Sequence, residues 1–468
     1  MNASDLSKIE YTIIDVFDKR YIWLPEIMIF FKANSLVEEI LDQYNKKDKK
    51  EIINCFKGEK KKTVEKILRK FLTFEKETKK YRYIMGNTRL EQDMSINSIE
   101  LNPTYSCNLR CKYCFAGDRV HFKKGYMTID TAKQAIDFLF KEGIDKDTLY
   151  IAFIGGEPLI NMPMIEFALK YSTEKAKKYN KQINYATTVN GTLLTREIMD
   201  LFDRYQVQAM ISMDSPEPVV QNFLRPTAGE KGSYDLIKEN GWISMLGSKG
   251  KSAVRSTITP YNLNLFDIAK TYYEAGFKHV HVEEVTTEDE KFVLTHKHIE
   301  YLKGEYNRIA QYLLEEVLKG KDIDSKPLFS RMYEIHNRKP RYNFCGAFNN
   351  SIGISPEGKF YPCDWMMDEQ YNIGSLDSGL DKEKYRRLRE QIPIPAKCRT
   401  CWARNLCGMG CRAKHKTAYA QGHEIDCDLE LHKYKLQLYL YSEIAEKNPE
   451  FLKRYEKKIK LGEGENAS

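Results

Sequence analysis

Membrane-spanning segments and secretion signals are missing from this sequence. No run of about 18 apolar residues occurs, and residues 1–10 lack the basic-then-apolar pattern of a signal peptide. We therefore expect a cytoplasmic location and no membrane partner. Internal repeats are also missing, which excludes a stacked-repeat fold.

A concentrated basic region is missing as well. The 468 residues carry a formal net charge of +8, but the excess is spread through lysine-rich stretches such as 46–50 and 57–62. Spread charge of this kind is typical of solvated helix faces, so we expect no nucleic-acid partner. A hydrophobic content of 42% with 30% charged residues indicates a globular protein of several domains.

Cysteine, by contrast, is present in clusters. All but one of the 11 cysteines lie at short spacings within residues 107–427. Thiols remain reduced in the cytoplasm, so such clusters indicate metal ligands rather than disulfides. The exception, Cys55, stands alone between Asn54 and Phe56, and we expect it to be a buried structural thiol.

Residues 1–90 are predicted to form a small separate unit. β-branched and aromatic residues at 11–17 and 21–31 favour strands, and Ser35 with Glu38 predicts a capping box at the start of a helix. Two or three strands followed by three helices resemble the winged-helix recognition elements that bind ribosomally made peptides. The resemblance implies that this unit binds the leader of a precursor peptide.

Residues 91–300 alternate between short apolar runs and amphipathic helices. This alternation predicts an α/β domain with a parallel sheet, a partial (β/α)6 barrel of the TIM type. The six predicted strands are 98–101, 149–153, 183–189, 208–213, 253–258 and 279–282. A helical connector over 301–344, a cysteine-rich domain over 345–430 and a charged helical tail over 431–468 follow. Chemistry is expected at the carboxyl ends of the strands.

The segment after the first of these strands carries three cysteines, Cys107, Cys111 and Cys114, with Tyr113 between the last two. Three thiolates on one loop can hold three irons of a cubane cluster and leave the fourth iron open. The alternative is a zinc site completed by a distant ligand. The spacing resembles the radical S-adenosylmethionine superfamily, which implies an oxidoreductase whose [4Fe-4S] cluster cleaves S-adenosylmethionine to a 5'-deoxyadenosyl radical.

The ends of the later strands carry further motifs of that superfamily. By resemblance, Gly155, Gly156 and Glu157 would contact the amino group of the cofactor, and Asn190 would lie near its ribose. Ser212 and Arg255 would hold its carboxylate, and Tyr113 would lie beside it. The superfamily usually has glycine after the aspartate at position 214, where this chain has serine.

Seven cysteines in the last third of the chain follow a second pattern, that of the SPASM domain of peptide-modifying radical enzymes. The resemblance implies two auxiliary [4Fe-4S] clusters and therefore three clusters in all. One auxiliary cluster would be held by Cys398, Cys401, Cys407 and Cys427, and the other by Cys345, Cys363 and Cys411.

An eighth cysteine is missing from that pattern. Sulfatase-maturing relatives have a further cysteine just before the seven, whereas this chain has none between Cys114 and Cys345. The cluster at Cys345, Cys363 and Cys411 is therefore expected to have an open iron, which could bind a substrate thiolate.

The sequence as a whole is similar to peptide maturases. The leading hypothesis is thioether formation between a cysteine sulfur and a carbon of a ribosomally made precursor peptide, as in the SCIFF and ranthipeptide maturases. Formylglycine generation in a sulfatase, carbon-carbon cross-linking and epimerisation are alternatives, and so is a zinc-stapled peptide-binding scaffold without chemistry. A flavodoxin or ferredoxin is expected as the electron donor. No residue identifies the peptide, its acceptor carbon or the general base.

Overall fold

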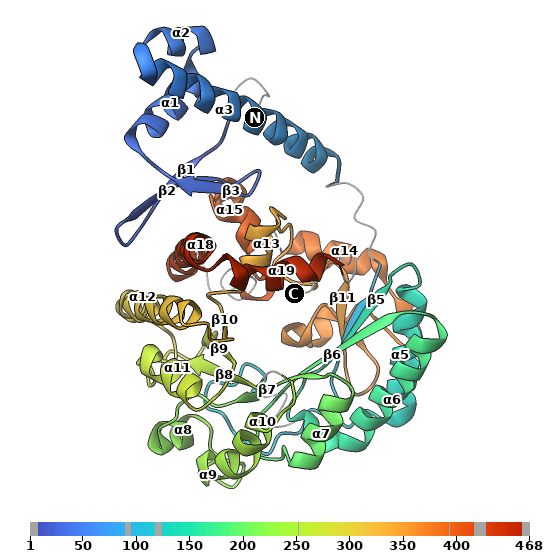
Figure 1. Cartoon of the computed structure of the whole chain (residues 1–468). Helices are drawn as coiled ribbons and strands as arrows, with labels where there is room; N and C mark the ends of the chain where they lie inside the picture. The colour runs from blue at the N-terminus through green and yellow to red at the C-terminus, as the bar shows by residue number, and fades with distance from the viewer. Residues whose placement is uncertain are drawn as a thin grey trace.

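The computed structural model describes residues 8–88, 95–117, 124–250, 252–392, 394–415 and 427–460 (Figure 1). The predicted boundary at residue 90 lies outside these ranges. The N-terminal unit has three antiparallel strands followed by three helices, in the predicted order. They are β1 (Thr12–Val16), β2 (Lys19–Leu24), β3 (Ile29–Lys32), α1 (Ser35–Lys46), α2 (Lys49–Asn54) and α3 (Gly58–Thr88).

Two local predictions for this unit are wrong. The N-cap of α1 is Asn34 rather than Ser35, because Asn34 has extended backbone and its side chain accepts a hydrogen bond from the Val37 amide at 2.9 Å. Cys55 is exposed rather than buried, since it caps the short helix α2 and its thiol donates only to the Glu51 carbonyl.

The central sheet has nine strands in the order β10-β9-β8-β7-β6-β5-β4-β11-β12. All neighbours are parallel except β11 and β12, so the predicted parallel α/β sheet is confirmed. The strands are β4 (Ser98–Leu101), β5 (Thr148–Phe153), β6 (Gln182–Val189), β7 (Gln208–Ser212), β8 (Ala253–Ile258), β9 (His279–Glu284), β10 (Asp324–Lys326), β11 (Ser351–Ile354) and β12 (Phe360–Tyr361). Within the described ranges, the two edge strands β10 and β12 do not pair with each other, so the sheet does not close into a full barrel.

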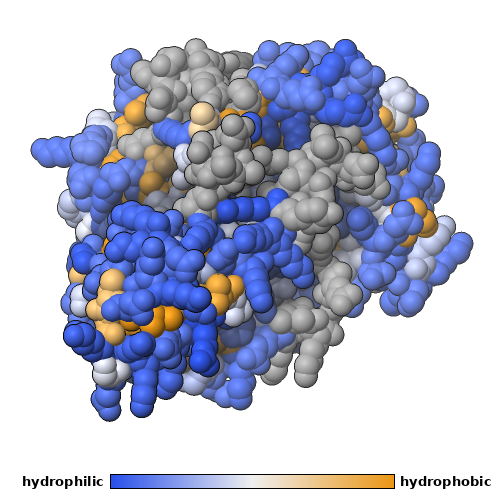
Figure 2. Space-filling model, turned by 90° about the horizontal axis from the view of Figure 1, so that it is seen from above, coloured by the Kyte–Doolittle hydropathy of each residue, from blue (hydrophilic) through white to orange (hydrophobic). Residues whose placement is uncertain are grey.

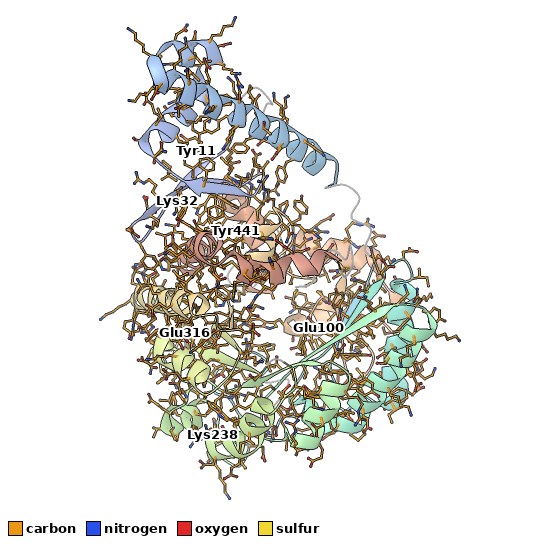
Figure 3. All side chains as sticks on the ribbon, viewed as in Figure 1. Tyr11, Lys32, Glu100, Lys238, Glu316 and Tyr441 are labelled. Carbon is orange, nitrogen blue, oxygen red and sulfur yellow. The ribbon has the colours of Figure 1, made fainter. Side chains whose placement is uncertain are left out.

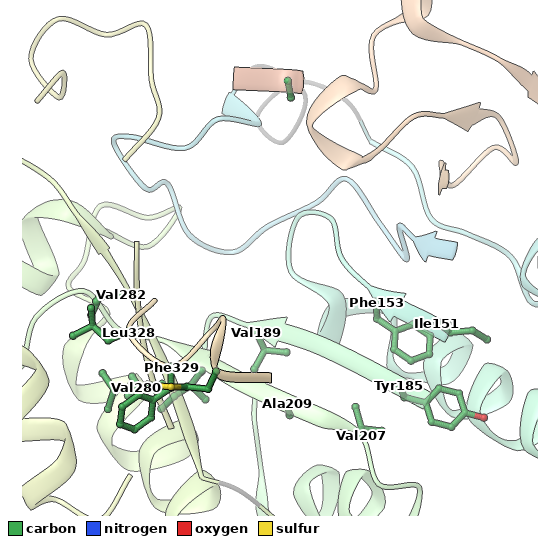
Figure 4. Packing of buried hydrophobic residues seen from close by; sticks show 14 of the residues in the cluster. Ile151, Phe153, Tyr185, Val189, Val207, Ala209, Val280, Val282, Leu328 and Phe329 are labelled. Carbon is green, nitrogen blue, oxygen red and sulfur yellow. The ribbon is translucent and has the colours of Figure 1, made fainter. Parts of the chain in front are cut away.

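The helices between the strands cover the outer face of the sheet (Figure 1). They begin at good caps: the side chain of Thr128 caps α5, and that of Thr295 caps α12. The longer helices are α5 (Ile129–Glu142), α6 (Met162–Lys178), α7 (Arg196–Arg204), α8 (Pro218–Leu224), α11 (Leu265–Glu274) and α12 (His296–Leu318), and the short helix α10 (Ile243–Leu246) follows α8. Val189, Val280 and Val282 lie in the apolar core under this layer (Figure 4).

The two faces of the sheet differ in how tightly they are covered. In β5, Leu149, Ile151 and Phe153 are buried and alternate with partly buried residues. Ala152, on the less covered face, lies opposite Glu100 of β4 in the register. This face therefore carries polar side chains toward the C-terminal cysteine-rich segment.

The C-terminal part combines short elements with two helices. The elements are α13 (Met332–His336), β13 (Gly374–Ser375), β14 (Gly379–Leu380), α14 (Lys382–Gln391), α15 (Ala396–Thr400), α16 (Arg404–Cys407), α18 (Asp428–Lys447) and α19 (Pro449–Lys460). The predicted helical tail is thus two helices, separated at Asn448 before Pro449. No helix in the described part of the chain combines the length and apolar character needed to cross a membrane.

The N-terminal sheet contributes to two cores, one on each face. Along β2, Ile22 and Leu24 pack with the unit's own helices, whereas Tyr21 and Trp23 belong to the main core. The Trp23 indole donates to the Trp402 carbonyl at 2.8 Å. Figure 3 shows Lys32 and Tyr441 at this junction. The N-terminal unit is therefore packed against the cysteine-rich segment and α18.

Candidate functional site

The loop with Cys107, Cys111 and Cys114 follows β4 and is held by a neighbouring segment. The Arg110 amide donates to the Pro226 carbonyl at 2.7 Å, and the Lys112 amide donates to the Leu224 carbonyl at 3.0 Å. Burial raises the pKa of both Cys107 and Cys111 to about 11. These thiols are therefore protonated at neutral pH until a metal displaces their protons.

Gly155 and Gly156 lie directly against the chain that leads into this loop. A Cβ on Gly156 would lie 2.2 Å from the Ser106 carbonyl oxygen, and a Cβ on Gly155 would lie 2.2 Å from Asn102 Oδ1. The Gly156 and Glu157 amides donate to the Thr104 and Ser106 carbonyls. The glycines thus permit close packing of two backbone segments at the end of the sheet.

Glu157 lies buried beside these glycines and organises the end of β6. One carboxylate oxygen accepts from the Leu159 amide at 3.1 Å and the other accepts from the Asn190 amide at 2.7 Å. Burial raises the pKa of Glu157 to about 7, and the two amides partly oppose this. A ligand ammonium placed here would favour the charged carboxylate.

Asn190 connects the end of β6 to the cysteine loop. The side-chain nitrogen Nδ2 of Asn190 donates to Asn108 Oδ1 at 2.7 Å and lies 3.9 Å from the Cys107 sulfur. The side-chain oxygen Oδ1 of Asn190 accepts hydrogen bonds from both the backbone amide and the hydroxyl of Thr192. The side chain of Asn190 therefore lies beside the first cysteine of the loop.

Two charged residues that the sequence motifs did not single out complete this end of the sheet. The carboxylate of Asp214 accepts a hydrogen bond from the Tyr113 hydroxyl and one from the Thr257 amide at 3.0 Å. Arg225 is buried and lies 3.5 Å from Asp214. Its positive charge opposes the rise in the pKa of Cys111 that burial causes.

The two residues predicted to hold the cofactor carboxylate lie on adjacent strands. Ser212 is buried at the end of β7, and Arg255 lies opposite it in the register of β8. Arg255 donates to Glu283 at 3.0 Å. Glu283 also lies 3.5 Å from Lys414, and the positive charges around it hold its pKa well below the usual range against the effect of burial.

Cys345, Cys363 and Cys411 line one cavity with an enclosed volume of about 40 Å³. Burial raises the pKa of Cys345 to about 11, and the nearby Cys411 adds to this rise. Asn343 and Arg412 also line the cavity. Among the described residues no fourth cysteine lines it, so the protein supplies three thiols.

The other four SPASM cysteines form a separate group. Burial raises the pKa of Cys427 to about 12, and Cys407, Cys398 and Cys401 contribute in the same direction. The other three cysteines are therefore near enough to Cys427 to affect its pKa, and a shared cluster on the four stays a prediction. Tyr434 of α18 hydrogen-bonds to Cys407.

The described thiols are not arranged for a single zinc ion. Tetrahedral zinc at about 2.3 Å from each sulfur would place the sulfurs about 3.8 Å apart. In the ranges that the structure covers, no three cysteine thiols lie within 4.8 Å of one another.

Aromatic and acidic side chains connect the first loop to the auxiliary cavity. Phe115 stacks on Trp365 with ring centroids 4.5 Å apart. Glu100 accepts a hydrogen bond from the Asp364 amide at 2.9 Å, and Figure 3 labels Glu100 in the part of the molecule that holds β4. Burial and the charge of Asp364 raise the pKa of Glu100 to about 7.

Comparisons with known proteins agree with this arrangement. Residues 101–244 match the model of the Radical SAM superfamily, and residues 345–402 match that of the SPASM iron-sulfur cluster-binding domain. A radical SAM cyclopropyl synthase, TigE of Paramaledivibacter caminithermalis, is 24% identical over 74% of this chain and 74% of its own length. A cysteine-type anaerobic sulfatase-maturating enzyme of Clostridium novyi is 23% identical over 69% of this chain and 90% of its own.

Solved structures share the fold. Native anSMEcpe with bound AdoMet aligns with a TM-score of 0.58 and 19% identity, covering 77% of this chain and 99% of that one. Streptococcus suis SuiB bound to S-adenosylmethionine aligns with a TM-score of 0.51 and 14% identity, covering 90% and 99%.

Proposed function

We propose that this chain, a radical SAM enzyme with a SPASM iron-sulfur domain, forms thioether bonds in a ribosomally made precursor peptide. One observation carries the proposal: the cavity at Cys345, Cys363 and Cys411 offers three thiols and, within the described chain, no fourth cysteine. A cluster held there would keep an iron position for a substrate thiolate. Relatives named for peptide or sulfatase maturation support a peptide or protein substrate.

The residues near the cysteine triad and those near the auxiliary cavity would have separate roles. Cys107, Cys111 and Cys114 would hold the cluster beside S-adenosylmethionine, with Glu157, Asn190 and Ser212 as its neighbours. When bound, the cofactor and the clusters supply the radical that removes a hydrogen atom from the peptide carbon and the acceptor for the remaining electron. The chain itself must position the peptide between the two sites and exclude water.

The thiol proton also needs an acceptor. Each thioether removes one C–H hydrogen atom and one S–H proton from the peptide, with one electron left for an acceptor. Glu100 lies next to Asp364, which follows the cavity residue Cys363. With a pKa raised to about 7, Glu100 is suited to accept a proton near neutral pH. We propose Glu100 with Asp364 as the base.

Leader binding is proposed at the outer edge of β3. The Ala33 amide donates to the Arg20 carbonyl, so the backbone N–H and C=O groups of every second residue of β3 point toward β2. Phe30 and Lys32 then point their backbone groups away from β2, and no further strand pairs with β3 within the residues described. An extended leader could add there as a fourth strand.

The edge can be tested with two variants of one residue. Lys32→Ala and Lys32→Pro both lose the ion pair with Glu446, but only proline removes the outward N–H. We expect Lys32→Pro to weaken binding of a fluorescent candidate leader at least about tenfold relative to Lys32→Ala. Equal affinities would contradict leader binding at β3.

Sulfatase maturation is the second candidate, because both a curated relative and the anSMEcpe structure support it. The missing extra cysteine opposes it. Carbon-carbon cross-linking and epimerisation are distinguished by the product. The test is mass spectrometry of a small cysteine-rich peptide, encoded beside this chain, after anaerobic reaction.

A loss of two hydrogens per cysteine, with the thiols no longer alkylated, supports thioethers. The same mass loss with reactive thiols would point to carbon-carbon bonds, and no mass change with an inverted residue would point to epimerisation. Conversion of a sulfatase cysteine to formylglycine would establish the second candidate.

A further inference from the structure

Three basic side chains form a row across one face of the central sheet. Arg255 of β8 is opposite His281 of β9 in the register, and His281 is opposite Lys326 of β10. Residues in register on neighbouring parallel strands point to the same face. Val280 and Val282, which alternate with His281, lie in the apolar core, so the three basic residues face the other way (Figure 4). We call Arg255, His281 and Lys326 the basic row.

Two members of the basic row lack partners. His281 is only 6% exposed, and its buried Nδ1 atom has no hydrogen bond. Its Nε2 atom lies 3.6 Å from Glu283, which is too long for a hydrogen bond. Lys326 is exposed to solvent and forms no ion pair with any described residue. Because buried polar atoms are normally hydrogen-bonded, a ligand with acceptor oxygens would complete this row.

The acidic side chains around the basic row are already close to basic ones. The pairs are Glu283–Arg255 at 3.0 Å, Glu283–Lys414 at 3.5 Å, Asp324–His279 at 3.1 Å and Glu334–Arg341 at 2.8 Å. Arg331, whose charge acts on Lys326, has a buried Nε atom without a hydrogen bond and no ion pair within the described ranges. Lys326 and Arg331 therefore leave an excess of positive charge after the local acids are counted.

The row lies near both the cofactor residues and the auxiliary cavity. Arg255 is the predicted partner of the cofactor carboxylate. Burial lowers the pKa of Lys326 and raises that of Cys345, and in both cases the charge of Arg341 contributes to a lower pKa. Because charges more than about 10 Å apart are largely screened, Arg341 lies near both groups. A peptide with its thiolate in the cavity and its acceptor carbon at the cofactor would pass beside Lys326.

We propose that Lys326, with His281 and Arg331 beside it, binds a carboxylate of the precursor peptide. Lys326 supplies charge and N–H donors, and a neutral imidazole can donate one hydrogen bond from Nδ1. An acidic side chain and a C-terminal carboxylate share this chemistry. Hydrophilic side chains predominate in the coloured part of the face seen from above (Figure 2), so charged groups are available contacts for a peptide on that side. No bond forms or breaks at the site. The inference rests on the proposed peptide substrate and not on thioether formation.

Lysine labelling tests the site with defined probes. Limiting acetic anhydride modifies the anaerobically reconstituted protein, and mass spectrometry measures the labelling rate of Lys326. N-acetylaspartate methylamide represents an acidic side chain, N-acetylalanine represents a C-terminus, and N-acetylasparagine methylamide is the neutral control. Lys238 is the matched internal control, because burial lowers its pKa as well and its amine lies over Trp242, outside the row.

We expect one or both of the acidic probes to slow labelling of Lys326 at least about threefold, with Lys238 unchanged. The probe that protects identifies the source of the carboxylate. Absence of protection by both acids, or equal protection by the asparagine probe, would overturn the proposal. Equal protection by S-adenosylmethionine alone would assign the site to the cofactor and overturn it as well.

Peptide affinity provides a second measurement. Lys326→Gln should weaken binding of the candidate peptide without its leader about tenfold, and Lys326→Arg should retain the affinity. Equal affinities of Lys326→Gln and the unaltered protein would overturn the proposal. Protection of Lys326 together with a peptide that stays linear after reaction would reject thioether formation and support the carboxylate site.

Discussion

Cys411 is the residue on which the auxiliary cavity most plainly depends. Cys411→Ala should lower the iron content of the reconstituted protein by about four atoms per chain and leave the candidate peptide linear. Cleavage of S-adenosylmethionine should persist, because the triad is intact. Iron analysis and peptide mass spectrometry measure the two effects. Cys55→Ala is the control, since that exposed thiol should leave both readings unchanged.

Glu157 makes a prediction about pH and stability. Its pKa of about 7 in the folded chain exceeds its ordinary value of 4.5. Between these values the folded chain holds a proton that the unfolded chain has lost, so the free energy of unfolding falls as the pH rises. Glu157→Gln should remove up to about 3 kcal/mol of this fall between pH 4.5 and 7. Urea unfolding of both metal-free proteins at pH 5 and pH 7.5 measures this difference. An equal change in the free energy of unfolding between the two pH values, with and without Glu157→Gln, would contradict the prediction.

At the residue scale, short spacings of cysteine carried the prediction. Cys345, Cys363 and Cys411 line one cavity, and the assignment of the ten clustered cysteines to three clusters stays a prediction. The pairs Asp214–Arg225 and Glu100–Asp364 were not predicted, because each joins residues from separate elements and neither belongs to a local motif. Cys55 was predicted to be buried from its apolar neighbour alone, and the end of a short surface helix exposes it.

At the scale of elements, the packing of β5 against the cysteine loop is the sharpest constraint. Gly156→Ala would push a methyl group into the Ser106 and Tyr105 carbonyl oxygens. We expect a destabilisation of about 1–3 kcal/mol and loss of the triad's iron. Gly117→Ala is the matched control, because its added Cβ would meet nothing within 4 Å. Thermal unfolding and iron content measure both, and equal effects would contradict the role of Gly156.

The elements themselves were largely predictable. Six parallel strands have clear apolar periods, and their bounds differ from the prediction by at most two residues. The predicted helical connector over 301–344 is instead α12, which begins at His296 and ends at Leu318, followed by β10 and α13. The strand β10 was missed because three residues carry too short a pattern, and β11 was missed within the cysteine-rich segment. The place of β11 beside β4 depends on tertiary packing rather than on local sequence.

At the scale of the whole molecule, an ion pair joins the N-terminal unit to the segment that carries the auxiliary cysteines. Arg404, between Cys401 and Cys407, binds Glu10 through two hydrogen bonds of 2.7 and 2.6 Å and also donates to the Cys401 carbonyl. Glu10→Gln should therefore cost about 1–3 kcal/mol and speed hydrogen exchange in both β2 and residues 401–407.

The same sheet provides a matched control for this prediction. Asp15 binds Arg20 through two hydrogen bonds, but both side chains are more than half exposed. Asp15→Asn should therefore cost at most about 1 kcal/mol and leave residues 401–407 unchanged. Equal exchange in the two variants would show that Arg404 does not couple the unit to the cysteine segment.

The pairing of β11 with β4 also sets an order of events on the ribosome. Ser98 and Ser351, which meet across these strands, are 253 residues apart. At roughly 5–20 residues per second, the ribosome needs roughly 10–50 s to reach β11 after it has made β4. During this time one edge of β4 has no strand to pair with, although the cysteine triad that follows β4 has already been synthesised. Nascent chains would thus expose an unpaired strand beside three reactive thiols. Slower growth or added chaperone should raise the yield of intact protein more than added iron does.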